Sequence, residues 1–347
     1  MYQNFSSVQT MVDFQSRIVT YSPAFTIVPT YECFNRCSYC NFRVDPDAGK
    51  LIELSKVQEI LTRLQNQPVC EILILSGEVH PQSSRRQTWL QRIYDVGKLA
   101  LQMGFLPHTN AGILSFAEME KLKQVNASMG LMLEQVTPKL LQTVHKHAPS
   151  KVPSIRLQQL EWAGLLKIPF TTGLLLGIGE NQADWIDSLQ AIRDIHLRYQ
   201  HIQEVILQPH SPGKQQTFTA STFHPHLLPD VVALAREILP LEITIQIPPN
   251  LVSDQQWLLA CLEAGARDLG GIGPKDEVNP DYAYHTTAKL QELLYPGGWI
   301  LKPRLPVYSR IDDSIPQELQ PNIFKWVEQF EQWVHQNRKI ETPISVK

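Results

Sequence analysis

Eight short apolar segments rich in β-branched residues recur along the chain, with helix-forming stretches between them. The segments are Phe25–Pro29, Glu71–Leu75, Phe105–Thr109, Ser128–Leu133, Phe170–Leu176, Glu204–Leu207, Glu242–Ile247 and Arg267–Gly270. Strands that alternate with helices are typical of βα units around a parallel sheet. Eight such units close into a (β/α)8 barrel, so we predict an α/β fold of the TIM-barrel type.

Local signals between the strands agree with this pattern. Three helix starts are indicated by capping residues, namely Ser55, Thr137 and Ser253. The proline-rich stretch Pro209–Pro229 breaks the rhythm and predicts a long loop after the sixth strand. Loops at that end of a barrel commonly contact substrate.

We predict a single domain over residues 1–347, with a barrel core over about 17–310 and a C-terminal helical extension over 311–347. The segment Trp299–Arg310 looks extended. Residues Gln317–Gln336 form an amphipathic pattern whose stripe is Leu319, Ile323, Trp326, Phe330 and Trp333. Helical spacing of this kind favours packing against the barrel.

Charge and hydropathy exclude several partner classes. The formal net charge is −3 and lysine and arginine form no basic run, which argues against binding nucleic acid or an anionic membrane. No apolar run reaches the roughly 18 residues of a membrane-spanning helix. The chain begins without a signal-peptide pattern, so we expect a reducing, cytoplasmic location.

Three of the five cysteines, Cys33, Cys37 and Cys40, fall within eight residues. Three thiolates can hold a cubane [4Fe-4S] cluster and leave one iron open to another ligand. Structural zinc is the weaker alternative because it takes four ligands, and the nearest downstream histidine is His80. Cys70 opens a strand and Cys261 lies among leucines, so both are expected to pack in the core.

The spacing C-x3-C-x2-C, with Tyr39 before the last cysteine, resembles the cluster loop of the radical S-adenosylmethionine (SAM) superfamily. The resemblance implies a [4Fe-4S] cluster on the three cysteines, whose open iron binds S-adenosylmethionine. It also implies cofactor contacts from residues that follow the strands. These are Tyr39 in the loop, Ser76, Gly77 and Glu78 at the methionine amino group, Glu134 at the ribose, and Gly177 and Ile178 at the adenine.

Simpler interpretations of these residues remain open. Ser76-Gly77-Glu78 alone is only a turn, and Glu180 near a helix start is favourable without any ligand. A buried Glu134 would be costly unless paired, so either ligand contact or solvent exposure must explain it.

Polar residues at the ends of the third and sixth strands point to the same mouth of the barrel. Asn110, Gln208 and His210 could orient a substrate rich in hydroxyls and amides. His210 is also a weak candidate for a catalytic acid or base, although a histidine in a loop is more often solvated. The pairs His145/His147 and His224/His226 have no cysteine or carboxylate nearby in the sequence, and we expect them on the surface.

Further segments resemble the 7,8-didemethyl-8-hydroxy-5-deazariboflavin synthases, in particular their cyclising subunit. They are Ile18–Ser22, Gly173–Glu180 and Asp268–Pro274, within a similarity from about Arg17 to Arg310. The resemblance implies a lyase that cyclises 5-amino-5-(4-hydroxybenzyl)-6-(D-ribitylimino)-5,6-dihydrouracil with loss of ammonia. The products are the deazaflavin of coenzyme factor 420, methionine and 5′-deoxyadenosine.

The same resemblance implies an electron donor and functional pairing with a tyrosine-using radical SAM subunit. Two other classes stay open. The chain could be that tyrosine-using subunit or a radical SAM enzyme of the menaquinone pathway. It could also be a barrel-shaped binding protein with a structural metal site and no enzymatic activity.

Overall fold

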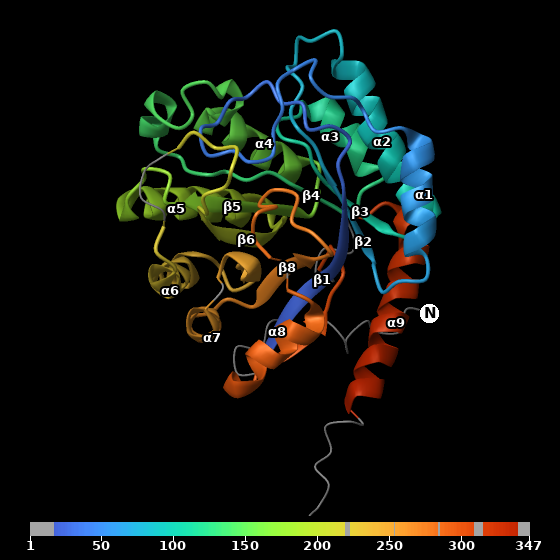
Figure 1. The fold of residues 1–347 in the computed structure, drawn as a ribbon, viewed down its shortest axis with the longest axis vertical. Coiled ribbons are helices and arrows are strands. Elements are labelled where there is room, and N and C mark those ends of the chain that lie inside the picture. The colour runs from blue at the N-terminus through green and yellow to red at the C-terminus, as the bar shows by residue number, and fades with distance from the viewer. Residues whose placement is uncertain (1–16, 219–222, 253, 284, 309–314, 339–347) are drawn as a thin grey trace, which may run out of the picture.

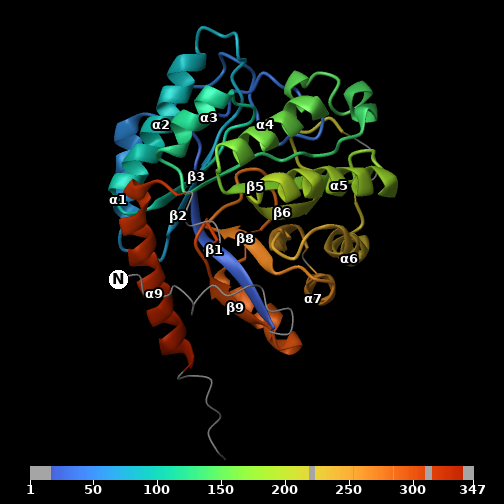
Figure 2. The same ribbon diagram turned by 180° about the vertical axis from the view of Figure 1, so that it is seen from behind.

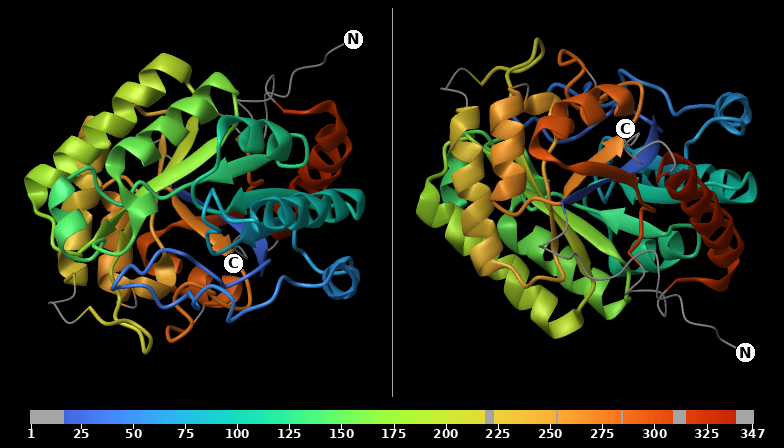
Figure 3. Two further views of the ribbon diagram at one scale, coloured as in Figure 1. Left: turned by 90° about the horizontal axis from the view of Figure 1, so that it is seen from above. Right: turned by 90° about the horizontal axis from the view of Figure 1, so that it is seen from below.

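The protein was analysed as a computed structural model, which describes residues 17–218, 223–252, 254–283, 285–308 and 315–338. In these residues a single parallel sheet has the order β2-β3-β4-β5-β6-β7-β8-β1-β9. Because β1 pairs with both β2 and β8, strands β1 to β8 close into a barrel. Helices surround the strands (Figure 3). The predicted (β/α)8 fold is confirmed.

Strands and helices alternate along the chain. The strands are β1 (Ile18–Ile27), β2 (Glu71–Leu75), β3 (Leu106–Asn110), β4 (Ser128–Gly130), β5 (Phe170–Leu176), β6 (Ile202–Pro209), β7 (Thr244–Gln246), β8 (Asp268–Ile272) and β9 (Ile300–Pro303). The helices are α1 (Leu54–Leu64), α2 (Arg86–Gln102), α3 (Phe116–Lys123), α4 (Pro153–Leu165), α5 (Gln182–Tyr199), α6 (Leu228–Ile238), α7 (Gln255–Glu263), α8 (Thr287–Leu294) and α9 (Gln320–Arg338).

The core lies between the strands and the surrounding helices. Strand β5 is buried along its whole length, as expected for a parallel strand covered on its outer face by helices. Helix α1 contributes Val57, Leu61 and Leu64 from one face, at the spacing of an amphipathic helix. Cys70 and Cys261 are fully buried, which confirms their predicted packing role. Among the described residues, no helix is both long and apolar enough to cross a membrane.

Strand β1 begins at Ile18, earlier than the predicted start at Phe25, because the strand continues through Pro23. Before Pro23 the strand pairs with β8 and β9, and after Pro23 it pairs with β2. The carbonyl of Pro23 accepts a hydrogen bond from the Cys70 amide at 2.9 Å. Proline lacks only the donor, so it is tolerated where the pairing partner changes.

The C-terminal segment closes the end of the barrel where the strands begin. The segment Trp299–Arg310, predicted to be extended, contains β9 and runs on through buried Arg304, Leu305 and Val307, while its last two residues, 309 and 310, lie outside the described part of the chain. Helix α9 then packs beside α1 and α2, away from α5 and α6 (Figures 1 and 2). Trp326 and Phe330 of α9 are buried with Leu106 and Ala127, as the aromatic stripe predicted.

Two of the predicted helix starts differ from the structure. Helix α1 begins at Leu54 after Glu53 with no side-chain cap, so Ser55 is not its capping residue. Thr137 precedes a 3-10 turn, Pro138–Gln142, instead of an α-helix. The cap of α7 is Asp254, whose carboxylate accepts from the Gln256 amide, and Ser253 lies outside the described residues.

The stretch predicted as a long loop, Pro209–Pro229, is mostly irregular. Its first residue ends β6, and its last residues include a 3-10 turn, Pro225–Leu227, and the start of α6. Residues 219–222 within it lie outside the described part of the chain.

Candidate active site

A cavity of about 360 Å³ runs through the barrel from the cysteine loop (residues 31–42) to the C-terminal segment. Many of the residues proposed from the sequence line it, namely Tyr39, Cys40, Ser76, Glu78, Asn110, Glu134, Gln208 and His210. Gly77, Gly177, Ile178, Cys33 and Cys37 lie outside its lining. The strand ends therefore bring the predicted polar side chains to one space, as expected for a barrel enzyme.

Backbone hydrogen bonds fix the cysteine loop to the top of the barrel. The loop follows β1 and is the blue segment above the strands in Figure 1. The amide of Phe34 donates to the Glu78 carbonyl at 2.9 Å, and the amide of Ser38 donates to the Val144 carbonyl at 3.1 Å. The loop is thus tied both to the turn after β2 and to the segment after β4.

The three thiols of this loop are free and half-buried. Burial raises the pKa of Cys37 to about 12, nearby Lys151 opposes the shift, and Cys40 and Cys33 add to it. Burial and the neighbouring Glu78 carboxylate also raise the pKa of Cys33. A cationic iron centre would be needed to hold these groups as thiolates, and soft sulfur ligands suit an iron–sulfur cluster.

The three thiols do not converge on one metal ion. No group of three histidine, cysteine, aspartate or glutamate side chains in the described residues could hold a single metal ion. In a cubane cluster each cysteine binds a different iron, so its ligands surround the cluster without converging on one point. The donor set and its position beside the cavity therefore fit a [4Fe-4S] cluster.

The turn after β2 is packed against the start of the cysteine loop. The Gly77 amide donates to the Thr30 carbonyl at 2.9 Å. A side-chain carbon at Gly77 would lie 2.1 Å from the Glu32 carbonyl oxygen, which leaves no room for any other residue. Glycine is therefore required at position 77 because the backbone of the cysteine loop, at Glu32, packs directly against it.

This contact predicts a large effect for Gly77→Ala. The methyl group would force the turn away from Glu32 and displace Glu78 with it. We expect thermal stability to fall and cofactor binding to weaken, since backbone at a tight contact cannot move cheaply. Gly271→Ala is a suitable control, because its added carbon would lie 3.1 Å from a side-chain methyl. Equal melting temperatures for the two variants would contradict the prediction.

Two buried cations neutralise the predicted carboxylates. Lys151 forms an ion pair with Glu134, and both side chains are almost fully buried. The Arg156 guanidinium, on α4, lies 3.3 Å from a Glu78 carboxylate oxygen. The burial of Glu134 is thus explained by its ion pair with Lys151. The sequence indicated that a buried Glu134 would need a partner but did not indicate which residue that is. Neither cation was predicted, since no local pattern links residue 134 to residue 151.

His145 corrects one sequence expectation. It was predicted on the surface, but it is buried, and its Nε2 lies 2.9 Å from the Tyr39 hydroxyl. The prediction was wrong because the cysteine loop folds over this segment. Burial, with help from Lys151 and Arg156, lowers the pKa of His145 to about 3, so the ring is neutral. The other histidines of the two pairs, His147, His224 and His226, are exposed as expected.

His210 lines the cavity but is held by its own loop. Its Nε2 lies 2.9 Å from the Gln216 side-chain oxygen, and its amide donates to the Leu176 carbonyl at 2.7 Å. Burial lowers its pKa, which keeps the imidazole neutral at pH 7. The ring is therefore better placed to hydrogen-bond a ligand than to carry a charge.

Gly177 and Ile178 border the site from outside the cavity. The Glu180 carboxylate accepts from both of their amides, at 2.5 and 2.8 Å. Gly177 has a φ of +93°, and a side chain there would lie 2.7 Å from Phe223 Cβ. Ile178 is fully buried in a small apolar cluster against which Tyr39 packs. Ile178 and its neighbours therefore form the apolar surface on which Tyr39 packs.

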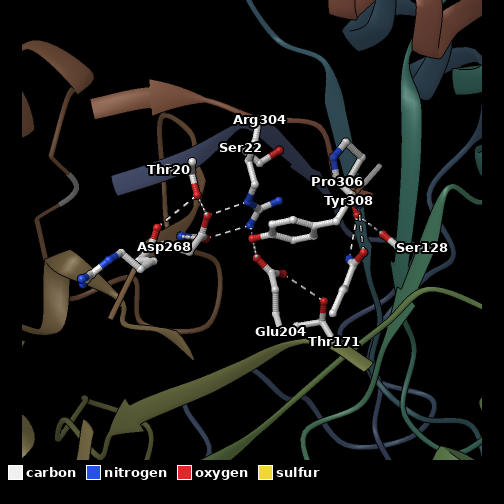
Figure 4. Close-up of polar contacts among 12 residues, drawn as sticks. Thr20, Ser22, Ser128, Thr171, Glu204, Asp268, Arg304, Pro306 and Tyr308 are labelled. Atoms are coloured by element: carbon white, nitrogen blue, oxygen red, sulfur yellow. Dashed lines mark hydrogen bonds and ion pairs between the residues drawn. The ribbon is translucent and has the colours of Figure 1, made fainter. Parts of the chain in front are cut away.

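The inner end of the cavity, where the strands begin, carries a buried ionic network (Figure 4). Arg304 donates to both Asp268 carboxylate oxygens, at 2.6 and 2.8 Å, and also pairs with Glu204. The Tyr308 hydroxyl donates to Glu204 at 2.9 Å. Burial raises the pKa of Glu204 to about 7, the Arg304 guanidinium opposes this shift, and the nearby Asp268 carboxylate adds to it. The sequence alone did not indicate this network, because its three charged members, Glu204, Asp268 and Arg304, are 36 or more residues apart.

Comparisons with known proteins agree with this geometry. Residues 27–192 match the family model of the radical SAM superfamily. The 7,8-didemethyl-8-hydroxy-5-deazariboflavin synthase of Trichormus variabilis is 69% identical over 311 residues, which cover 90% of this chain and 92% of the relative. The synthase of that name from Synechococcus elongatus is 59% identical, over 91% and 94% of the two chains.

The chain belongs to the 7,8-didemethyl-8-hydroxy-5-deazariboflavin synthase family of the radical SAM superfamily. It is therefore a radical SAM enzyme, and it uses a [4Fe-4S] cluster and S-adenosylmethionine as that superfamily does.

Solved structures show the same fold at low sequence identity. The FeFe-hydrogenase maturase HydG from Carboxydothermus hydrogenoformans has a TM-score of 0.69 at 18% identity, covering 85% of this chain and 70% of that one. Methylornithine synthase (PylB) has a TM-score of 0.64 at 15% identity, covering 87% and 88%. This likeness concerns the barrel.

Proposed function

We propose that this protein is the cyclising subunit of 7,8-didemethyl-8-hydroxy-5-deazariboflavin synthase. It would convert 5-amino-5-(4-hydroxybenzyl)-6-(D-ribitylimino)-5,6-dihydrouracil to the deazaflavin with loss of ammonia, as a lyase of coenzyme factor 420 biosynthesis. The observation that carries the proposal is the 69% identity to a synthase of that name over nearly the full length of both chains. The segments Ile18–Ser22 and Asp268–Pro274 favour the cyclising subunit.

In this proposal Cys33, Cys37 and Cys40 hold the [4Fe-4S] cluster. When bound, the cluster and S-adenosylmethionine together supply a 5′-deoxyadenosyl radical that takes a hydrogen atom from the substrate. The chain's part is to position both partners and exclude water. Cys40 lines the cavity directly, so the cluster would border the same space as the predicted substrate contacts.

Different residues around the cavity would contact different parts of S-adenosylmethionine. We assign the methionine amino group to the turn of Ser76, Gly77 and Glu78, and the ribose to Glu134. Tyr39, backed by Gly177 and Ile178, would lie beside the adenine. The buried cations Lys151 and Arg156 complement the methionine carboxylate, since a buried carboxylate requires paired charge.

The assignment of Lys151 predicts a measurable loss of cofactor affinity. Lys151→Met leaves Glu134 buried without its cation and removes one positive charge from the cavity wall. We expect the Kd for S-adenosylmethionine to rise about 10-fold or more, since breaking a buried charge pair costs about 2–5 kcal/mol. Equilibrium binding to the reconstituted enzyme measures this.

Lys139→Met is the matched control. Lys139 pairs with Asp184 at 2.7 Å, but half of its side chain is exposed and it does not line the cavity. Exposed pairs contribute about 0–1 kcal/mol, so this variant should bind S-adenosylmethionine as the wild type does. If both variants bind normally, the role of Lys151 is contradicted.

Asn110, Gln208 and His210 are the proposed substrate contacts. All three line the cavity. Their amide and imidazole groups suit the carbonyl, imine and hydroxyl groups of the adduct. We further propose that the adduct comes from a tyrosine-using partner subunit and that a separate electron donor reduces the cluster.

One experiment separates this function from its alternatives. The anaerobically reconstituted protein is incubated with S-adenosylmethionine, a reductant and the preformed adduct, and in parallel with tyrosine and 5-amino-6-(D-ribitylamino)uracil. Deazaflavin fluorescence in the first reaction only is the expected result. Consumption of S-adenosylmethionine with no fluorescence from the adduct would refute the cyclase assignment, and reaction with tyrosine would indicate the partner subunit's activity.

A further inference from the structure

The inner end of the cavity is unusually polar for a barrel interior. Barrel interiors are commonly filled by layers of branched apolar side chains. Here the lining includes the polar residues Glu71, His108, Thr171, Glu204, Gln246 and Arg304. Thr171, Glu204 and Arg304 are satisfied by the ionic network, whereas the other three have free hydrogen-bonding groups.

The hydrogen bonds of His108 leave one ring nitrogen free. The Ser128 hydroxyl donates its only proton to the Pro306 carbonyl at 2.6 Å, so it must accept from His108 Nδ1, which is also 2.6 Å away. The ring therefore carries its proton on Nδ1. Burial lowers the pKa of His108 to about 3, so Nε2 is an unprotonated acceptor. Within the described residues, Nε2 has no hydrogen-bond donor.

Glu71 is a buried carboxyl group without an ion-pair partner in the described part of the chain. It is the first residue of β2 and is 7% exposed. Burial raises its pKa, although Arg304 and the nearby Ser22 hydroxyl oppose the shift. A carboxyl group has about four acceptor positions, so most of its capacity is unused.

Gln246, at the end of β7, adds an amide that makes no hydrogen bond to any described residue. It lines the cavity with Glu71 and His108. Asn110 and Gln208, nearer the mouth, are likewise without side-chain hydrogen bonds in the described structure. Buried polar groups normally find partners, so a run of unsatisfied ones along a cavity indicates a ligand that supplies them.

We propose that Glu71, His108 and Gln246 form a subsite for the hydroxylated chain of the substrate. Consecutive hydroxyls offer both donors and acceptors, which match a carboxyl group, an imidazole acceptor and an amide. A flat aromatic group would leave these side chains unsatisfied. The proposal rests on the proposed function, and it orients the adduct with its polyol chain inward and its reacting rings toward the cysteine loop.

The test measures binding, so it does not depend on turnover. Calorimetry compares 5-amino-6-(D-ribitylamino)uracil with its 6-pentylamino analogue, which keeps the five-carbon chain and lacks the hydroxyls. We expect the wild type to bind the hydroxylated compound at least about 10-fold more tightly, because a site built to hydrogen-bond hydroxyls discriminates strongly against their loss. Glu71→Gln and Gln246→Met should each reduce this ratio while affinity for the pentyl compound stays unchanged.

Two controls keep the outcomes distinct. Glu161→Gln makes the same chemical change as Glu71→Gln on the exposed face of α4, where Glu161 pairs with Arg198, and it should leave the ratio unchanged. Circular dichroism confirms that each variant is folded. Equal affinity of the wild type for both compounds, or an equal loss for both in the folded variants, overturns the subsite. The binding assay needs no turnover. Its result can therefore be interpreted even if the turnover assay refutes the cyclase assignment.

Discussion

Replacing Cys37 by alanine is expected to give a colourless, folded protein that makes no deazaflavin. Two remaining thiols cannot replace the third corner of the cluster, so iron and sulfide should be absent after anaerobic reconstitution. The barrel should survive, because the cysteine loop is held by backbone hydrogen bonds such as Phe34 to Glu78, and not by the thiol. Iron content, visible absorption and circular dichroism measure these outcomes.

Cys261→Ala is the matched control. Cys261 is fully buried in α7 and packs in the barrel core, far in sequence from the cysteine loop. This variant should assemble a normal cluster and lose about 1 kcal/mol of stability, a usual cost for a small core truncation. A Cys37→Ala protein that keeps its iron and sulfide, or that unfolds globally, would contradict the assigned role of the loop.

The second large effect is expected at Arg304, which holds the inner end of the cavity together. Arg304→Met leaves Asp268 and Glu204 buried without their shared cation. Removing one partner of a buried ion pair costs about 3–5 kcal/mol, so the free energy of unfolding should fall by that amount. Denaturant titration measures it. Arg17→Met removes an arginine whose pair with Glu263 is half exposed, and it should cost at most about 1 kcal/mol.

The pH dependence of this loss has a definite sign. The pKa of Glu204 is raised from its ordinary value of 4.5 to about 7 by burial. A carboxyl group with a raised pKa favours the folded state at low pH, and that contribution disappears as the pH rises from 4.5 to 7. Without Arg304, protonation is the remaining way to neutralise the site. The destabilisation by Arg304→Met should therefore be larger at about pH 8 than at about pH 5, and equal losses would contradict the account.

The fold could be predicted because its determinants are local and repeated. Each strand segment, such as Phe170–Leu176, carries its own β-branched or apolar signal, and alternation with helices specifies a parallel barrel. The extension of β1 through Pro23 was missed, because it depends on a change of pairing partner. The start of α1 and the cap of α7 were also predicted at the wrong residue, because Ser55 and Ser253 carry the usual capping signal, whereas α1 begins without a side-chain cap and α7 is capped by Asp254.

Motifs in the sequence indicated some residues that line the cavity, whereas the residues that pair with them became apparent only in the folded chain. The cysteines, Glu78 and Glu134 follow strands, and the resemblance to the radical SAM superfamily indicated their roles. Lys151 and Arg156 meet those carboxylates only in the folded chain. Arg304 reaches Glu204 across 100 residues. Charge compensation shows that such partners must exist, but only tertiary structure shows which residues they are.

The most direct test of the central claim follows a hydrogen atom from substrate to cofactor. The reconstituted enzyme is given S-adenosylmethionine and the adduct deuterated on its carbon atoms, in ordinary water, and the 5′-deoxyadenosine is analysed by mass spectrometry together with the fluorescent product. We predict that 5′-deoxyadenosine gains a single deuterium as deazaflavin forms. Unlabelled 5′-deoxyadenosine, or labelled 5′-deoxyadenosine without deazaflavin, would contradict cyclisation by this enzyme.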